Sequence, residues 1–126
     1  MSLPKFEYIG VDTVGEACSQ LAKLKKGARV LAGGTDLLVK LKDRVCEPKY
    51  LIGIKGIKGL DKVVYDRSQG LRIGALATHK EVMDSGVVQR RYASVVEALE
   101  KIGTVQVRNL GTVGGNLCNA APSADS

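Results

Sequence analysis

The chain has 126 residues, of which 44% are hydrophobic and 25% are charged, and 19 basic residues outnumber 13 acidic ones to give a formal net charge of +6. This composition excludes disorder and a coiled coil, and a chain of this length buries roughly two-thirds of its surface when it folds. No apolar run is long enough to cross a bilayer and no signal peptide opens the sequence, so a cytoplasmic protein without a membrane span is expected.

The cysteine spacing argues against a metal site, and the distribution of basic residues argues against nucleic-acid binding. Cys18, Cys46 and Cys118 lack the short C-x-x-C spacing of zinc and iron–sulfur sites, so no metal is expected in this chain. The basic excess gathers in residues 23–29, at the end of a predicted helix, where lysines complement the helix dipole. No aromatic residue lies inside that cluster, whereas proteins that bind single strands stack bases on aromatic rings. Nucleic acid is therefore not expected as a partner.

Strand and helix patterns alternate through the first 58 residues. The predicted elements are strands at residues 6–11, 28–34 and 49–57 and helices at residues 12–27 and 35–44. The first helix is expected to begin at a capping box of Thr13 and Glu16 and to end with Gly27 as its C′ cap. The strand at residues 28–34 is expected to be buried. This β-α-β-α-β order favours a small parallel sheet with crossover helices.

The pattern changes near residue 60. Residues 60–66 and 71–76 predict the two strands of a β-hairpin around the turn R-S-Q-G. A capping box of Thr78 and Glu81 then opens a short helix, and Ser94 with Glu97 is expected to cap another. His79, in the first turn of the former helix, is interpreted as a surface residue. A differently built, antiparallel region is therefore expected after residue 59.

Two separated double glycines are the strongest functional signal. Gly33 and Gly34 fall at a strand-to-helix junction, where free N–H groups bind anions and backbone without side chains lets a ligand approach closely. Gly114 and Gly115 offer a second such backbone in a half-apolar loop that closes the sequence. Little basic charge is nearby, so the two loops together suggest a pyrophosphate held mainly by backbone amides. Neither a P-loop nor a Rossmann motif is present.

Three stretches in this order and spacing resemble the flavoprotein subunit of the molybdenum hydroxylases: AGGTDLLVKLK, IGALATHKEV and IGTVQVRNLGTVGGNLCNAAPSAD. That family includes xanthine dehydrogenase, aerobic carbon monoxide dehydrogenase and 4-hydroxybenzoyl-CoA reductase. The resemblance implies an α+β, PCMH-type FAD-binding domain. Its first subdomain, parallel β/α, would occupy residues 1–58, and the start of an antiparallel-sheet-plus-helix subdomain would occupy residues 59–126.

The resemblance also assigns cofactor-binding residues. Two groups would contact the FAD phosphates and adjoining sugar: Leu31, Ala32, Gly33, Gly34, Thr35, Asp36 and Leu37, and Thr112, Val113, Gly114, Gly115 and Asn116. Asp125 would accept hydrogen bonds from cofactor hydroxyls, and Ile102 would line the apolar side of the pocket, although plain core explains Ile102 equally well. Arg108 and Asn109 would brace the loop or face a partner subunit. No catalytic residue is expected from this chain, because the flavin carries the redox chemistry.

The complete enzymes of this family imply further partners. Substrate is oxidised at a molybdopterin on a large subunit, two [2Fe–2S] clusters on a small subunit relay the electrons, and FAD delivers them to an acceptor. The family's subunit continues beyond the S-A-D segment, so this chain is expected to be an N-terminal fragment, inactive alone and weak in FAD binding. Without FAD, the amides of residues 111–126 are expected to lack partners or to borrow them by self-association.

Two other functions stay open at this point. A flavin oxidoreductase of the same superfamily that works alone would share the double-glycine loops. A basic interaction module without cofactor would instead explain the charge of +6 and would show steep salt dependence if it bound nucleic acid. The pairing of QVRN with TVGGN disfavours the stand-alone flavoenzyme, and the molybdenum hydroxylase subunit is the favoured interpretation.

Overall fold

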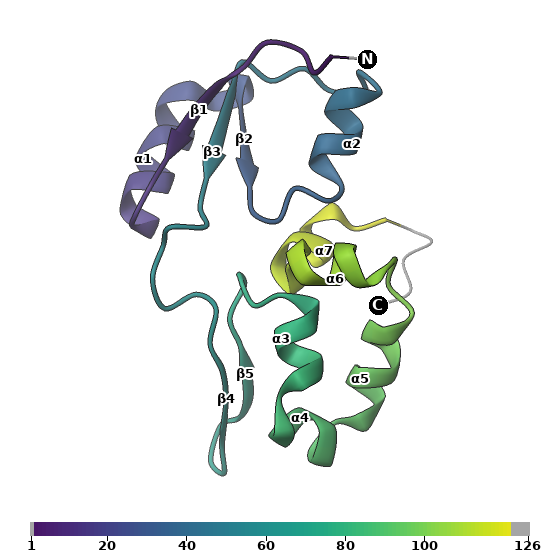
Figure 1. Ribbon diagram of the computed structural model, residues 1–126. Helices are drawn as coiled ribbons and strands as arrows, with labels where there is room; N and C mark the ends of the chain where they lie inside the picture. The colour runs from purple at the N-terminus through teal and green to yellow at the C-terminus, as the bar shows by residue number, and fades with distance from the viewer. Residues whose placement is uncertain (1, 122–126) are drawn as a thin grey trace. The chain divides into compact units, whose positions relative to one another are not determined.

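A computed structural model describes residues 2–121 and divides the chain into two compact units, Met1–Lys58 and Gly59–Ser126. They are called the N-terminal unit and the C-terminal unit below. Figure 1 shows a mixed α+β structure with a small sheet in each unit. The expected fold class is confirmed.

The N-terminal unit is built on a three-stranded parallel sheet. Its strands are β1 (Glu7–Gly10), β2 (Ala28–Leu31) and β3 (Tyr50–Gly53), in the order β1-β3-β2. The central strand β3 carries the apolar core, because Leu51 and Ile52 are fully buried. In register, Gly10 and Leu31 both face Gly53, so the three strands end together at one edge. The parallel sheet expected from the β-α-β-α-β order is confirmed.

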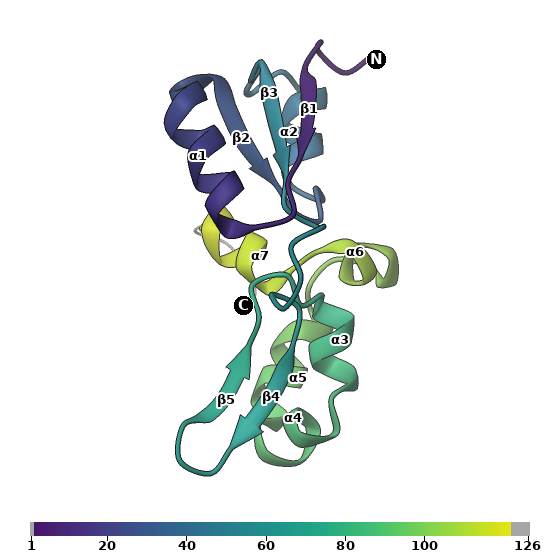
Figure 2. The same ribbon diagram turned by 90° about the vertical axis from the view of Figure 1, so that its left-hand side faces the viewer.

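Two helices cover this sheet, α1 (Val14–Leu24) and α2 (Leu37–Lys42). The crossover from β1 to β2 and the return from β2 to β3 run in opposite directions across the sheet. Since both crossovers are right-handed by rule, the helices lie on opposite faces, as Figures 1 and 2 show. Ala17 of α1 and Leu41 of α2 are buried.

Two expectations for the N-terminal unit are wrong. The first helix does not end on Gly27, because Lys25 takes the left-handed turn, with φ of 49°, and Lys25–Gly27 form a 3-10 turn that leads straight into β2. The strand β2 is not fully buried either. It lies at an edge of the sheet, and Val30 keeps 40% of its surface exposed. The cap at the start of α1 is confirmed, since the Thr13 hydroxyl accepts from the Glu16 amide at 3.1 Å.

The C-terminal unit begins with the predicted hairpin of β4 (Val63–Asp66) and β5 (Gly70–Ile73). Asp66 organises the turn: its Oδ1 accepts the amides of Ser68 at 2.7 Å and Gln69 at 3.1 Å, together with the Ser68 hydroxyl. These hydrogen bonds, the Ser68 hydroxyl first, hold the pKa of the Asp66 carboxyl below its ordinary value. Gly70 closes the turn with φ of 81°.

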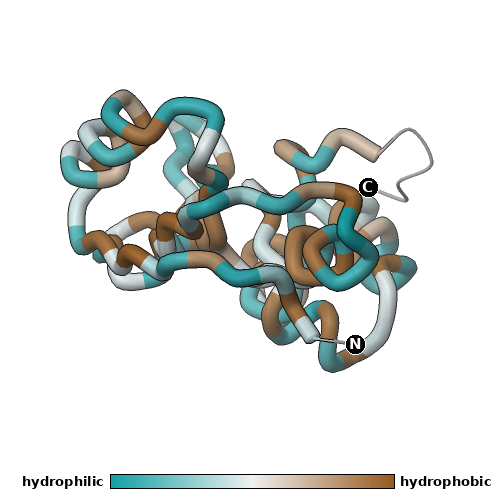
Figure 3. Tube along the Cα trace, turned by 90° about the horizontal axis from the view of Figure 1, so that it is seen from above, coloured by the Kyte–Doolittle hydropathy of each residue, from teal (hydrophilic) through white to brown (hydrophobic). Residues whose placement is uncertain are grey.

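As far as residue 121, five short helices follow the hairpin: α3 (His79–Asp84), α4 (Gly86–Arg91), α5 (Ala93–Glu100), α6 (Val105–Leu110) and α7 (Val113–Asn119). Apolar and hydrophilic residues alternate along the tube in Figure 3. Five buried apolar residues of this unit form one cluster: Ala77, Val82, Val88, Leu99 and Ile102. The partly buried Val113 packs against this cluster, so the start of α7 is anchored to the core.

Two expectations for the C-terminal unit are also wrong. Ser94 does not cap α5, which begins one residue earlier with Tyr92 at the N-cap position and no side-chain cap bond. His79 is not a surface residue but is only 3% exposed. The imidazole is buried because it packs against the backbone at Gly111. The other predicted cap is confirmed, because the Thr78 hydroxyl accepts from the Glu81 amide at 3.1 Å.

Candidate functional site

The first double glycine lies in the loop that joins β2 to α2, residues 32–36. Gly34 has φ of 78°, a left-handed conformation that favours glycine. A Cβ at Gly34 would lie 3.1 Å from both the Leu31 Cδ1 and the Leu38 Cδ1, tighter than ordinary contact. The Leu38 amide donates to the Gly34 carbonyl at 3.0 Å and closes the loop onto α2. The conformation therefore favours glycine at position 34, and any side chain there would also displace the two leucine side chains.

The backbone amides of this loop are available to a ligand. Within residues 2–121, the amides of residues 32–36 make no hydrogen bond to any protein acceptor. Asp36 occupies the N-cap position of α2, but its side chain makes no cap bond. Consecutive free N–H groups in a tight glycine-containing loop are suited to binding an anion. The loop can therefore donate several hydrogen bonds to one phosphate group.

The second double glycine lies in a helix, not in the loop that the sequence suggested. Thr112 is the N-cap of α7, and its hydroxyl accepts from the Gly115 amide at 3.0 Å. The Asn116 amide donates to the Thr112 carbonyl at 3.0 Å. Glycine is a poor helix former, but here the cap and the helical bond support the first turn. Gly114 and Gly115 are thus part of regular structure.

The start of α7 packs closely against a neighbouring segment. The Val113 amide donates to the Ala77 carbonyl and the Gly114 amide to the Ala75 carbonyl, each at 3.0 Å. A Cβ at Gly114 would lie 2.6 Å from that Ala75 oxygen. For the described residues 111–121, the expectation that these amides lack partners is therefore wrong, because packing satisfies two of them and helix or cap bonds satisfy others. Glycine at position 114 allows two backbones to approach each other.

His79 supports the same segment and was missed from the sequence. Its amide donates to the Gly111 carbonyl at 3.0 Å, and an isolated bridge joins Thr78 to Thr112. A Cβ at Gly111 would lie 3.1 Å from the His79 Cδ2. The buried imidazole thus packs directly under the residue that precedes the α7 cap. In the sequence, the only indication that His79 and the segment at residues 111–116 are associated was the order of the motifs, with IGALATHKEV before QVRN and TVGGN.

Ile102 and Arg108 lie on a turn and a helix that support each other. Ile102 follows α5 and belongs to the buried core cluster. Arg108 of α6 donates from Nη1 to the Ile102 carbonyl at 2.9 Å and to the Glu100 and Gly103 carbonyls at 3.3 Å. Arg108 therefore braces the turn that carries Ile102, rather than the segment 111–116. Asp125, the last candidate residue, lies outside the described residues.

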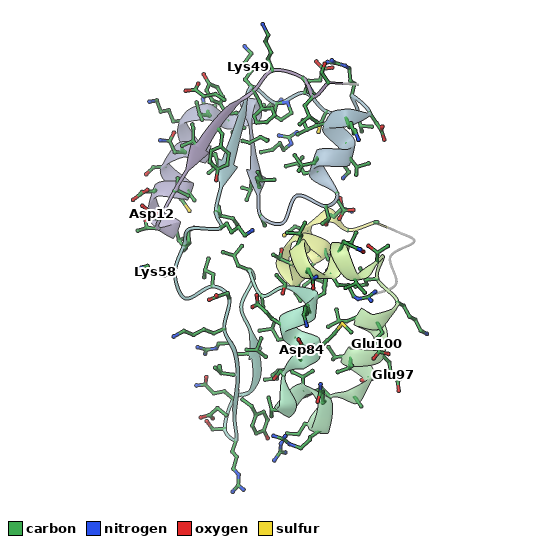
Figure 4. All side chains as sticks on the ribbon, viewed as in Figure 1. Asp12, Lys49, Lys58, Asp84, Glu97 and Glu100 are labelled. Carbon is green, nitrogen blue, oxygen red and sulfur yellow. The ribbon has the colours of Figure 1, made fainter. Side chains whose placement is uncertain are left out.

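The charged side chains of the described residues form no candidate metal site. Across residues 2–121, no three histidine, cysteine or carboxylate side chains are grouped so that they could hold a metal ion. Figure 4 labels Asp84 on α3 and Glu97 and Glu100 on α5 among the acidic side chains. No helix in this part of the chain is long and apolar enough to cross a membrane.

A glycine loop with free amides, placed after a parallel strand, is typical of proteins that bind a nucleotide phosphate. The chain matches the family described as the FAD binding domain in molybdopterin dehydrogenase over residues 4–126, and it belongs to that family. It is 37% identical to the carbon monoxide dehydrogenase medium chain of Hydrogenophaga pseudoflava, over 97% of this chain and 42% of the relative. It is 34% identical to the glyceraldehyde dehydrogenase medium chain of Sulfolobus acidocaldarius, over 97% and 43%.

Solved structures share the fold. The carbon monoxide dehydrogenase of Hydrogenophaga pseudoflava matches with a TM-score of 0.89 and 38% identity, over 93% of this chain and 40% of that chain. A cyanide-inactivated Cu,Mo-CO dehydrogenase matches with a TM-score of 0.94 and 30% identity, over 99% and 43%. The resemblance and the PCMH-type fold are confirmed. The chain spans less than half the length of these relatives.

Proposed function

We propose that this chain binds FAD through its phosphates, as part of the FAD-binding subunit of a molybdenum hydroxylase. The proposal rests on the loop at residues 32–36, whose free amides flank a glycine in a conformation that residues with side chains rarely adopt. Membership of an FAD-binding family supports FAD as the ligand. The proposed contacts on this side are Leu31, Ala32, Gly33, Gly34, Thr35, Asp36 and Leu37.

The C-terminal unit contributes differently in this proposal. The amides of Val113, Gly114 and Gly115 already donate to protein acceptors. The first turn of α7 would therefore contact FAD mainly through its side chains and not through backbone N–H groups. Thr112 and Asn116 are the polar residues proposed there. Ile102 would contribute through the core that fixes α7, and Asp125 stays a proposed contact to the cofactor hydroxyls.

The chain's own residues would bind and orient the cofactor. When bound, FAD supplies the redox chemistry that passes electrons from iron–sulfur clusters on a small partner subunit to an acceptor. A large subunit with molybdopterin would carry the substrate site, consistent with the names of the relatives, which are medium chains of dehydrogenases. A cytoplasmic location belongs to the same proposal.

A titration of the purified chain with FAD, followed by flavin fluorescence, tests this function. Gly34→Val places a branched side chain at φ of 78° and against two leucines, at a cost of about 1–3 kcal/mol. We expect the FAD dissociation constant to rise by roughly 5- to 150-fold. Gly70→Val is the matched control, because Gly70 has nearly the same φ, 81°, but lies in the hairpin turn. A circular-dichroism spectrum shows whether each variant is folded.

The two variants separate binding from stability. If both lose FAD binding equally while folded, the loop at residues 32–36 has no special role. If Gly34→Val binds FAD as the unchanged chain does, the loop does not hold the phosphates, and the proposal is refuted. Loss of FAD binding in Gly34→Val but not in Gly70→Val supports the proposal that the loop at residues 32–36 binds the phosphates.

A further inference from the structure

Tyr8 lies across the edge of the parallel sheet on two glycines. A Cβ at Gly53 would lie 2.5 Å from the Tyr8 Cζ and 2.6 Å from its Cε2, and a Cβ at Gly10 would lie 3.4 Å from its Cε1. The ring therefore occupies the space that a side chain at Gly53 would fill, and it lies within ordinary contact distance of Gly10. It nevertheless stays 58% exposed. One face of the ring rests on backbone while the rest of the side chain is accessible.

The sheet register places this ring beside the glycine loop. Gly10, Gly53 and Leu31 are paired in one row across the three strands, and neighbouring strands lie about 4.8 Å apart. The Tyr8 hydroxyl lies over Gly53, so it is one strand away from Leu31, which opens the loop at residues 32–36. Ligands of open α/β sheets bind at this carboxyl edge.

The side chains of this row also share a face. Tyr8 is paired with Leu51, and alternate residues along a strand point to the same side. Leu31 is on that side too, since Leu51 is paired with Arg29. The side chain of Leu31 approaches Leu38 of α2 around Gly34. Tyr8 and Leu31, the residue that directly precedes the glycine loop, therefore lie on the same face of the sheet.

The Tyr8 hydroxyl makes no hydrogen bond to another described residue in the range 2–121. A phenol can donate one hydrogen bond and accept others. We propose that Tyr8 is a further ligand-binding residue, whose hydroxyl donates a hydrogen bond to a phosphate held by the amides of residues 32–36. The two glycines fix the ring so that little side-chain freedom is lost on binding. This inference rests on the proposed function, because it assumes that the loop holds a phosphate.

Tyr8→Phe removes the hydroxyl and keeps the ring on its glycines. The variant and the unchanged chain are titrated with FAD and with riboflavin, which shares the flavin but has no phosphate. We expect FAD affinity to fall roughly tenfold, as for one hydrogen bond to a charged group, and riboflavin affinity to stay unchanged. ADP, added as a competitor of FAD, should also lose roughly tenfold in affinity.

Two further variants make the test specific. Tyr50→Phe is the matched control, because Tyr50 lies one position from Leu51 in β3 and so points to the opposite face; its FAD affinity should not change. Gly53→Ala keeps the Tyr8 hydroxyl but displaces the ring, and it should weaken FAD binding as Tyr8→Phe does. A circular-dichroism spectrum is recorded for each variant.

The possible results are distinguishable. FAD affinity unchanged in Tyr8→Phe overturns the role of Tyr8 and leaves the proposed function standing. An equal loss for FAD and riboflavin also overturns it, because the hydroxyl would then serve the flavin ring. If the unchanged chain binds no FAD, the proposed function fails, and this inference fails with it.

Discussion

Replacing Gly114 by alanine should destabilise the C-terminal unit strongly. The added Cβ would lie 2.6 Å from the Ala75 oxygen and 2.9 Å from the Ala75 Cβ. Both neighbours are fixed, so one backbone must move, at about 1–3 kcal/mol for overpacking. That movement also breaks the bond from the Gly114 amide to Ala75, which contributes about 1 kcal/mol. The expected loss is roughly 2–4 kcal/mol of unfolding free energy.

The matched control is Gly86→Ala in the same unit. Its Cβ would approach only the mobile end of the Arg90 side chain, at 3.0 Å. Since alanine is a better helix former than glycine, this variant should be as stable as the unchanged chain or more stable. Urea unfolding followed by far-ultraviolet circular dichroism measures both variants. Equal stability of Gly114→Ala and Gly86→Ala would refute the close backbone packing described here.

Two further changes probe single side chains of the C-terminal unit. Thr112→Ala removes the cap of α7 and should lower the unfolding free energy by about 1 kcal/mol, whereas Thr112→Ser keeps the hydroxyl and should lose less; equal losses in urea unfolding would contradict the cap. The hydrogen bonds that lower the Asp66 pKa stabilise the hairpin turn above the ordinary carboxyl pKa of about 3.9, and this contribution disappears as the pH falls through the lowered value. An NMR titration should place the Asp66 midpoint below the ordinary carboxyl value; a midpoint at the ordinary value would show that the turn bonds do not persist in solution.

Local signals in the sequence were sufficient for the parallel sheet, the hairpin and two of the helix caps. The caps at Thr13 and Thr78 act within three residues, so a short motif contains all the atoms involved. The parallel sheet and the hairpin follow from apolar periodicity and turn residues, which depend only on neighbours along the chain. The loop at residues 32–36 was found in the same way, as a double glycine between a strand and a helix.

Predictions failed where composition conflicted with packing. Two glycines and several small polar residues favoured a loop at the end of the chain, yet residues Val113–Asn119 form a helix. The bonds from Val113 and Gly114 to Ala77 and Ala75 join segments far apart in the sequence. Such contacts offset the low helix propensity of glycine, and no local pattern contains them.

The sequence by itself determined the order of strands and helices in the N-terminal unit, the hairpin and the glycine loop that is the candidate phosphate site. Tertiary structure alone decided which backbone amides stay free and which are used internally. At residues 32–36 they stay free, because the loop follows an edge strand. At the start of α7 they are used, and His79 is buried under Gly111. A hydrogen bond depends on the distance between its two atoms, and only the folded chain sets that distance for residues remote in sequence.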